Sequence, residues 1–309
     1  MRLLTFTATG RTAAGLEVNG FVVDLARAAS ALPTARTSLP GDLREILEMG
    51  DEALQTARRI QEWVASALTA GQRPTGSDGQ TIVYEVGQVK INAPIPRPGK
   101  IICLGLNYAD HAAESGSELP KSPLLFAKFA NTIIGTGDPI ILPRASEKVD
   151  YEAELAFVIG RRAKHVPLDR AMEYVAGYMN LNDVSARDLQ QETNQFFKGK
   201  SPDTFAPCGP YLVTRDEVPD PHGLDIRCYV NGELMQNSNT RQLIFNIPFL
   251  VHHISRTITL EPGDIISTGT PSGVGMARKP PRFLKPGDVV RVEVAGLGVL
   301  ENPVIAESE

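Results

Sequence analysis

The sequence predicts an α+β fold that is mainly β. Six segments of strand length are rich in β-branched and aromatic residues, and few helical periodicities separate them. These segments are residues 101–106, 124–127, 152–159, 209–213, 224–230 and 288–294. Asn231-Gly232 follows one of them and is a strong two-residue hairpin signal. Because the strands do not alternate with helices, we expect mainly antiparallel sheets.

A proline-rich segment divides the chain. Pro94, Pro96 and Pro98 cannot continue a helix or a central strand. We therefore predict a small N-terminal α+β domain at residues 1–97 and a larger, strand-rich domain at residues 98–309.

Four segments predict helices, and the first begins at residues 40–43. Residues 51–68 carry apolar side chains at three- and four-residue spacing. Asp51 and Glu52 at the start of this segment suit the positive end of a helix dipole. Helices are also predicted over residues 167–178 and 247–255.

The composition argues against two classes of partner. A net charge of -5, with no basic cluster longer than a pair, argues against nucleic acid. No apolar run approaches the roughly 20 residues that cross a bilayer, so no membrane partner is expected. Residues 1–6 lack the apolar region of a signal peptide, and we expect a cytoplasmic protein. Cys103, Cys208 and Cys228 match no motif and are expected to be buried free thiols.

Two glutamates inside a predicted strand are the most informative feature of the chain. Glu152 and Glu154 are two residues apart, so their side chains project from the same face. A solvated strand face would account for such a pair. In a dry site the two carboxylates would repel each other and lose their hydration, and a divalent cation would remove both problems.

A third carboxylate is predicted in the polar segment 180–188, where Asp183 is the candidate. Carboxylate ligands without histidine or cysteine favour a hard cation, so we expect Mg²⁺ or Mn²⁺ ahead of Ca²⁺. Zinc is disfavoured by the same ligand set.

His111 and Glu114 form a second candidate group. Their spacing places them on one face of a helical turn, where the carboxylate can orient the imidazole as a general base for water. A surface pair with little energetic effect is the alternative. The polar segment 115–120 that follows is typical of a lid.

Two basic residues and a threonine complete the candidates read from the residues themselves. Lys128 follows an apolar run and could hold a substrate carboxylate or a metal ligand, or reach solvent along the surface. Arg187 is expected to pair with Asp188 or Glu154. Thr270 lies in a glycine-rich run whose backbone amides can bind a carboxylate.

Several of these sequence segments, taken in order, resemble motifs of the fumarylacetoacetate hydrolase family. The resemblance covers residues 98–305 and implies a β-roll catalytic domain of the family type, usually a homodimer. It points to the group of acylpyruvases and 2-hydroxyhepta-2,4-diene-1,7-dioate isomerase-like proteins. The matching phrases are residues 105–114, 150–154, 182–188, 199–205 and 267–275.

The resemblance also implies roles for individual residues. Lys200 would act in catalysis by stabilising an enolate oxygen, together with His111 and Glu114. Gln190 and Thr204 would join Lys128 and Thr270 in binding substrate. The sequence departs from the family at Pro202, where an aromatic residue is usual.

We therefore expect a divalent-metal-dependent hydrolase that cleaves a carbon–carbon bond in a 2,4-dioxo acid such as an acylpyruvate, through a metal-stabilised enolate. The alternatives are an oxaloacetate-type decarboxylase or a 2-hydroxy-dienedioate isomerase on the same scaffold. A non-catalytic metalloprotein that binds a dicarboxylate is the alternative from another class.

Overall fold

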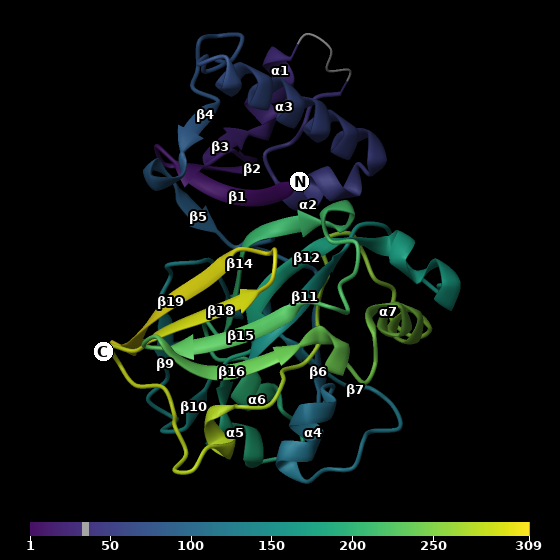
Figure 1. Cartoon of the computed structure of the whole chain (residues 1–309), viewed down its shortest axis with the longest axis vertical. Coiled ribbons are helices and arrows are strands. Elements are labelled where there is room, and N and C mark those ends of the chain that lie inside the picture. The colour runs from purple at the N-terminus through teal and green to yellow at the C-terminus, as the bar shows by residue number, and fades with distance from the viewer. Residues whose placement is uncertain (33–36, 309) are drawn as a thin grey trace.

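A computed structural model describes residues 1–32 and 37–308 and has the expected α+β, mainly β architecture. Its largest sheet has twelve strands and runs from the N-terminal part of the chain into the rest (Figure 1). In spatial order its main path is β4 (Val83–Glu85), β3 (Phe21–Asp24), β2 (Arg11–Val18), β1 (Arg2–Ala8), β14 (Ala206–Thr214), β12 (Val175–Asn182), β11 (Ala153–Ile159), β17 (Ile265–Ser267), β6 (Ile101–Gly105) and β7 (Leu124–Lys128). β5 (Lys90–Asn92) pairs with β1, and β8 (Ile133–Ile134) pairs with β14.

A second sheet has five strands, and a third has two. The five-stranded sheet has the order β16 (Glu233–Asn239), β15 (Asp225–Val230), β18 (Val289–Val294), β19 (Val299–Ala306) and β9 (Ile140–Leu142). β10 (Val149–Asp150) pairs with β13 (Ser185–Ala186). Pairing is mainly antiparallel, with parallel pairs between β6 and β17, β8 and β14, and β9 and β19.

The helices are short except for one. They are α1 (Leu25–Ala31), α2 (Leu43–Glu48), α3 (Asp51–Thr69), α4 (Ala109–Ser115), α5 (Arg187–Gln191), α6 (Phe197–Lys200) and α7 (Ile247–Ser255). Short 3₁₀ segments lie at Val86–Gln88, Ala130–Thr132, Leu168–Tyr174, Arg215–Glu217, Thr240–Gln242 and Gly275–Ala277. Helices α4, α5 and α6 lie at the end of the molecule away from α1, α2 and α3 (Figure 1).

The predicted hairpin is present between β15 and β16. Val230 pairs with Glu233, and the two turn residues have positive φ, 54° at Asn231 and 81° at Gly232. Positive φ at both central positions is what the favoured two-residue hairpin turn requires, and asparagine followed by glycine tolerates it.

The helix predicted over residues 167–178 is wrong in its last four residues. A 3₁₀ helix occupies Leu168–Tyr174, and β12 begins at Val175. β12 lies between β11 and β14, so its backbone forms ladders on both sides. Pairing on both sides and burial of the strand outweigh the local helical pattern.

β11 is buried on both faces along its whole length. Leu155 and Phe157 pack into one apolar cluster, and Ala156 and Val158 pack into another on the opposite face. A strand between two cores reads as a continuous apolar run, which is why this segment was recognisable as a strand. The three cysteines are buried and free, as expected.

The N-terminal part of the chain is joined to the rest by strand pairing. Leu3 of β1 lies opposite Leu212 of β14, so the twelve-stranded sheet is continuous between the two parts. The division into domains at residues 97 and 98 stays a prediction.

Replacing Phe157, the aromatic residue of β11, tests this core. We expect Phe157→Ala to lower the free energy of unfolding by about 3–5 kcal/mol, because a cavity replaces the ring. Leu168 is half exposed, so Leu168→Ala should change it by no more than about 0.5 kcal/mol. Urea denaturation of both variants measures the difference, and equal losses would contradict the assigned core.

Candidate metal centre and active site

Three carboxylates meet at the beginning of β11. Glu152, Glu154 and Asp183 each offer an oxygen, and these oxygens lie within 4.8 Å of one another. Glu152 is 6% exposed, and the other two side chains are fully buried. A solvated strand face therefore does not describe this pair of glutamates.

The pairing of β11 with β12 brings these residues together. Ala153 lies opposite Asn182, so Asp183 follows β12 where Glu152 precedes β11. The Asp183 amide donates to the Glu152 carbonyl oxygen at 2.9 Å, and the Glu152 amide donates to Asn182 Oδ1 at 3.0 Å. Residues thirty positions apart in the chain thus become neighbours.

Two lysines neutralise part of this charge. Lys200 Nζ, at the end of α6, donates to Glu152 Oε2 at 2.7 Å and to Asp183 Oδ2 at 2.8 Å. Lys128 Nζ, at the end of β7, donates to Asp183 Oδ1 at 2.6 Å and to the Val184 carbonyl oxygen at 3.1 Å. Both lysines are buried, so Lys128 binds a carboxylate of the cluster instead of reaching solvent.

Arg187 is a third cation at the cluster, with partners other than those predicted. Its Nη2 lies 2.7 Å from Glu152 Oε1 and 2.9 Å from Asp150 Oδ2. The expected pairing with Asp188 or Glu154 is therefore wrong. Asp188 instead accepts hydrogen bonds from Ser146 Oγ and the Glu147 amide, which turn it away from the cluster.

Glu154 has a different environment from the other two carboxylates. Its Oε2 accepts hydrogen bonds from Ser267 Oγ and from the Gly269 amide at 3.0 Å. Its Oε1 is buried and has no hydrogen-bond partner among the described residues. Burial, Asp183 and Glu152 together raise the pKa of Glu154 well above its usual value.

The pKa of Glu152 is shifted in the opposite direction. Burial by itself would raise the pKa of Glu152, but Lys200 and Arg187 outweigh burial and lower it to about 2. Burial would likewise lower the pKa of Lys200, yet Asp183 and Glu152 raise it above its ordinary value. Lys200 is therefore a permanent cation, and Glu152 a permanent anion, at neutral pH.

The residues present fit a divalent cation. All three ligands are carboxylates, the donors that hard cations prefer. Each carboxylate oxygen has two lone pairs, so an oxygen bonded to lysine can still coordinate a cation. The unpartnered Oε1 of Glu154 is a buried acceptor that a cation would satisfy.

His111 and Glu114 lie together on α4, as predicted. His111 Nδ1 is 3.3 Å from Glu114 Oε2, and the two side chains are 19% and 26% exposed. The Gly273 amide donates to both carboxylate oxygens of Glu114, at 2.9 and 3.1 Å. His111 is close enough to the cluster to add to the lowering of the Glu152 pKa.

Three predicted substrate-binding residues have side chains that are hydrogen-bonded inside the protein. Gln190 Oε1 accepts from Arg187 Nη1 at 3.2 Å. Thr204 Oγ1 accepts from the Ile141 amide at 2.9 Å, and Thr270 Oγ1 donates to the Ala153 carbonyl oxygen at 2.9 Å. Their role toward substrate stays a prediction.

Several residues that shape the cluster were not found in the sequence. Ser267 and Gly269 bind Glu154, Asp150 holds Arg187, and Gln236 binds the strand between the two glutamates. Ser267 and Gly269 fall inside the recognised glycine-rich run, which could have been read as a carboxylate-binding segment. Gln236 gives no signal, because a glutamine within a strand has no distinctive spacing.

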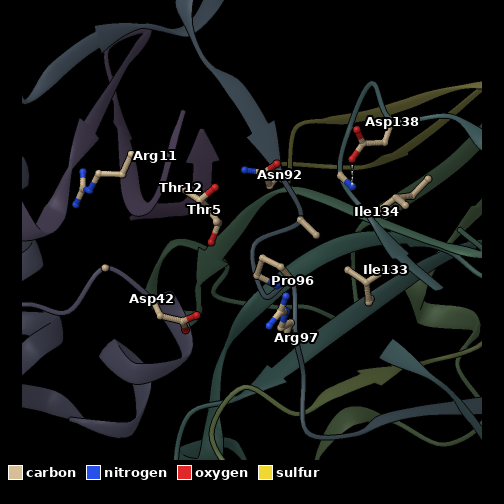
Figure 2. A pocket seen from close by; sticks show the side chains of 13 residues that line it. Thr5, Arg11, Thr12, Asp42, Asn92, Pro96, Arg97, Ile133, Ile134 and Asp138 are labelled. Atoms are coloured by element: carbon tan, nitrogen blue, oxygen red, sulfur yellow. Dashed lines mark hydrogen bonds between the residues drawn. The ribbon is translucent and has the colours of Figure 1, made fainter. Parts of the chain in front are cut away.

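A cavity of about 650 Å³ lies apart from this centre. It is at the junction of the N-terminal part with the rest of the chain, where Asp42 and Arg97 line its wall (Figure 2). Its lining includes no residue of the acidic cluster. The candidate metal centre is therefore not part of this cavity.

Comparison with known proteins identifies the family. The family model described as fumarylacetoacetate (FAA) hydrolase, C-terminal, matches residues 100–305. The chain belongs to this family, as its motifs indicated. Enzymes of the family act on small molecules.

Relatives of known name span three chemistries. A mitochondrial oxaloacetate tautomerase of Xenopus laevis is 46% identical over 99% of this chain and 90% of its own length. The fumarylacetoacetate hydrolase structure from Exiguobacterium antarcticum is 35% identical, with a TM-score of 0.81 over 99% of this chain and 100% of its own. A 5-carboxymethyl-2-hydroxymuconate delta-isomerase structure from Mycobacterium smegmatis is 33% identical, with a TM-score of 0.74 over all of both chains.

The cytoplasmic location predicted from the sequence is contradicted by these relatives. The Xenopus protein and relatives from rat, cattle and human are named mitochondrial. Among the described residues, no helix is both long enough and apolar enough to cross a membrane.

The raised pKa of Glu154 predicts that cation binding releases a proton. The carboxyl group keeps its proton to a higher pH than a free glutamic acid, and a cation replaces that proton. We therefore expect affinity for Mn²⁺ to rise with pH until Glu154 ionises without the cation. Glu152 is already ionised and contributes no proton.

Calorimetric titration with Mn²⁺ in buffers of different ionisation enthalpy counts the released protons. Glu154→Gln should weaken binding and abolish the release. Equal proton release from the unchanged chain and from this variant would show that Glu154 is not the source.

Proposed function

We propose that this protein is a Mg²⁺- or Mn²⁺-dependent enzyme that interconverts the keto and enol forms of oxaloacetate. The buried acidic cluster of Glu152, Glu154 and Asp183 is the observation that carries this proposal. The relatives named oxaloacetate tautomerase support it, since one of them aligns with nearly the whole chain. They favour the alternatives predicted from the sequence, an oxaloacetate-type decarboxylase or a 2-hydroxy-dienedioate isomerase, over the carbon–carbon hydrolase, although tautomerisation itself was not among those alternatives.

The reaction needs charge stabilisation and proton transfer, but no carbon–carbon bond is cleaved: the bond between carbons 2 and 3 becomes double as the carbonyl on carbon 2 becomes a hydroxyl. A proton leaves carbon 3 of the keto form, and a proton joins the oxygen on carbon 2, so the atoms balance. Negative charge develops on that oxygen as the proton leaves carbon 3. A cation bound by the three carboxylates would supply Lewis-acid stabilisation of this charge.

Lys200 provides fixed positive charge beside the same carboxylates. Its raised pKa makes it a poor base at neutral pH and suits it to stabilising an oxyanion. Lys128 and Arg187 hold Asp183 and Glu152 in place. With a cation added, the cluster carries excess positive charge, which favours a dianionic substrate over a neutral one.

His111 and Glu114 supply the proton transfer in this proposal. In the neutral tautomer that carries its proton on Nδ1, His111 donates to the Glu114 carboxylate and its Nε2 is left to accept a proton. Glu114 is itself held by the Gly273 amide, so the pair has a fixed position on α4. The imidazole takes the carbon-bound proton and returns it to oxygen.

Hydrolysis of a 2,4-dioxo acid is the second candidate. The same His111–Glu114 pair could deprotonate a water that attacks the carbonyl at carbon 4, and fumarylacetoacetate hydrolase is among the structural relatives. Lys200 and the cation would then stabilise a pyruvate enolate. Assembly as a homodimer stays a prediction for either reaction.

Product analysis separates the candidates. The purified protein, with Mg²⁺ or Mn²⁺, is given enol oxaloacetate in one assay and an acylpyruvate in another. If the protein is a tautomerase, the ultraviolet absorbance of the enol decays faster with protein than without it. NMR then shows that the product is the keto form of oxaloacetate. Pyruvate formed from oxaloacetate would indicate decarboxylation, whereas pyruvate and a carboxylic acid formed from acylpyruvate would indicate hydrolysis.

Removing one ligand charge should abolish most of the activity. We expect Glu152→Gln to lower kcat/KM for the tautomerisation by about 10²–10³-fold, because it weakens charge stabilisation in the transition state. Glu301 is exposed, so Glu301→Gln is the matched control and should leave kcat/KM unchanged. Full activity of Glu152→Gln after chelation and metal re-addition would refute the assigned metal centre.

A further inference from the structure

The side chain of Gln236 lies buried beside the beginning of β11. It projects from β16 and is 1% exposed. Its Oε1 accepts from the Ala153 amide at 2.9 Å. Its Nε2 donates to Thr270 Oγ1 at 2.8 Å and to the Pro271 carbonyl oxygen at 2.9 Å. The amide group is thus bonded at both ends.

Ala153 is the residue between the two glutamates of the cluster. Its amide is bonded to Gln236, and its carbonyl oxygen accepts from Thr270 Oγ1 at 2.9 Å. Since Gln236 also donates to Thr270, the three residues form a closed ring of hydrogen bonds. Two side chains therefore hold the backbone at the residue that lies between Glu152 and Glu154.

These side chains replace strand pairing that is missing at this position. The pairing of β11 with β17 covers Ala156 to Val158, and Ala156 lies opposite Ser267. Ala153, nearer the acidic cluster, is beyond that ladder. β12 pairs with one edge of β11 at Ala153, and on the other edge, which has no neighbouring strand here, Gln236 and Thr270 bind the backbone amide and carbonyl of Ala153.

We propose that Gln236 is a positioning residue for the metal centre. By fixing the Ala153 backbone, it sets the separation of the Glu152 and Glu154 carboxylates, although it touches neither. The segment that it binds also presents the Gly269 amide to Glu154. This inference rests on the proposed function only in requiring that the three carboxylates bind a cation.

A purely structural role for Gln236 makes a different prediction. A buried amide that only satisfies backbone groups would contribute to folding stability but not to cation affinity. Asn302 is such a group, since its buried Nδ2 donates to the carbonyl oxygens of Gly135 and Asp138, each at 2.8 Å. It provides a matched control away from the acidic cluster.

The test compares Gln236→Met with Asn302→Leu in the full chain. Mn²⁺ affinity is measured from the electron paramagnetic resonance signal of free Mn²⁺, and thermal unfolding is measured without cation. We expect Gln236→Met to raise the Kd for Mn²⁺ about 10–100-fold, as is usual when a residue supporting metal ligands is lost. Asn302→Leu should lower the melting temperature and leave the Kd unchanged.

Gln236→Glu provides a second variant should the methionine variant not fold. It keeps the acceptor for Ala153 but loses the two donated bonds, so the Kd for Mn²⁺ should again rise. Protonation of the new glutamate restores a donor, so its Kd should approach that of the unchanged chain as the pH falls. An unchanged Kd in the folded variants would overturn the positioning role alone. Failure of the unchanged chain to bind Mn²⁺ would overturn the metal centre as well.

Discussion

The balance of charge at the beginning of β11 is the constraint on which the site depends. Glu152, Glu154 and Asp183 are buried together, and a buried charge deprived of its partner destabilises a protein by roughly 3–5 kcal/mol. Compensation comes from Lys128 at the end of β7 and Lys200 at the end of α6. Elements distant in sequence must therefore converge on one point, and their arrangement is fixed by ion pairs as well as by apolar packing.

The three carboxylates have separate tasks within this balance. Glu152 and Asp183 are held by cations, so their positions are set before any metal arrives. Glu154 is held only by a hydroxyl and a backbone amide, and one of its oxygens is unpartnered among the residues described. Two anchored carboxylates stand beside a third carboxyl group whose pKa is raised and whose unpartnered oxygen would gain by binding a cation.

Much of the fold and of the acidic cluster could be predicted because the signals are local. The apolar run of β11, the Asn-Gly turn and the spacing of Glu152 and Glu154 are each visible within ten residues. Asp188 was mispredicted as a partner of Arg187 because nearness in sequence was taken for nearness in space. Asp188 turns toward Ser146, while Asp150, far along the chain, reaches Arg187. The role of Gln236 could not be predicted, because it depends on the contact between β16 and β11. These strands belong to different sheets, and no sequence pattern indicates that they meet.

The pairing of β1 with β14 has a consequence for how the chain folds during synthesis. Leu3 leaves the ribosome 209 residues before its strand partner Leu212. Contacts of such long sequence separation form slowly. Until then Arg2 and Leu3 lack their β14 partners, although β2 can already pair along the whole of β1 and β5 can pair with Thr5 to Thr7. The N-terminal strands are therefore only partly paired during this part of synthesis. An unpaired strand edge can associate with other chains.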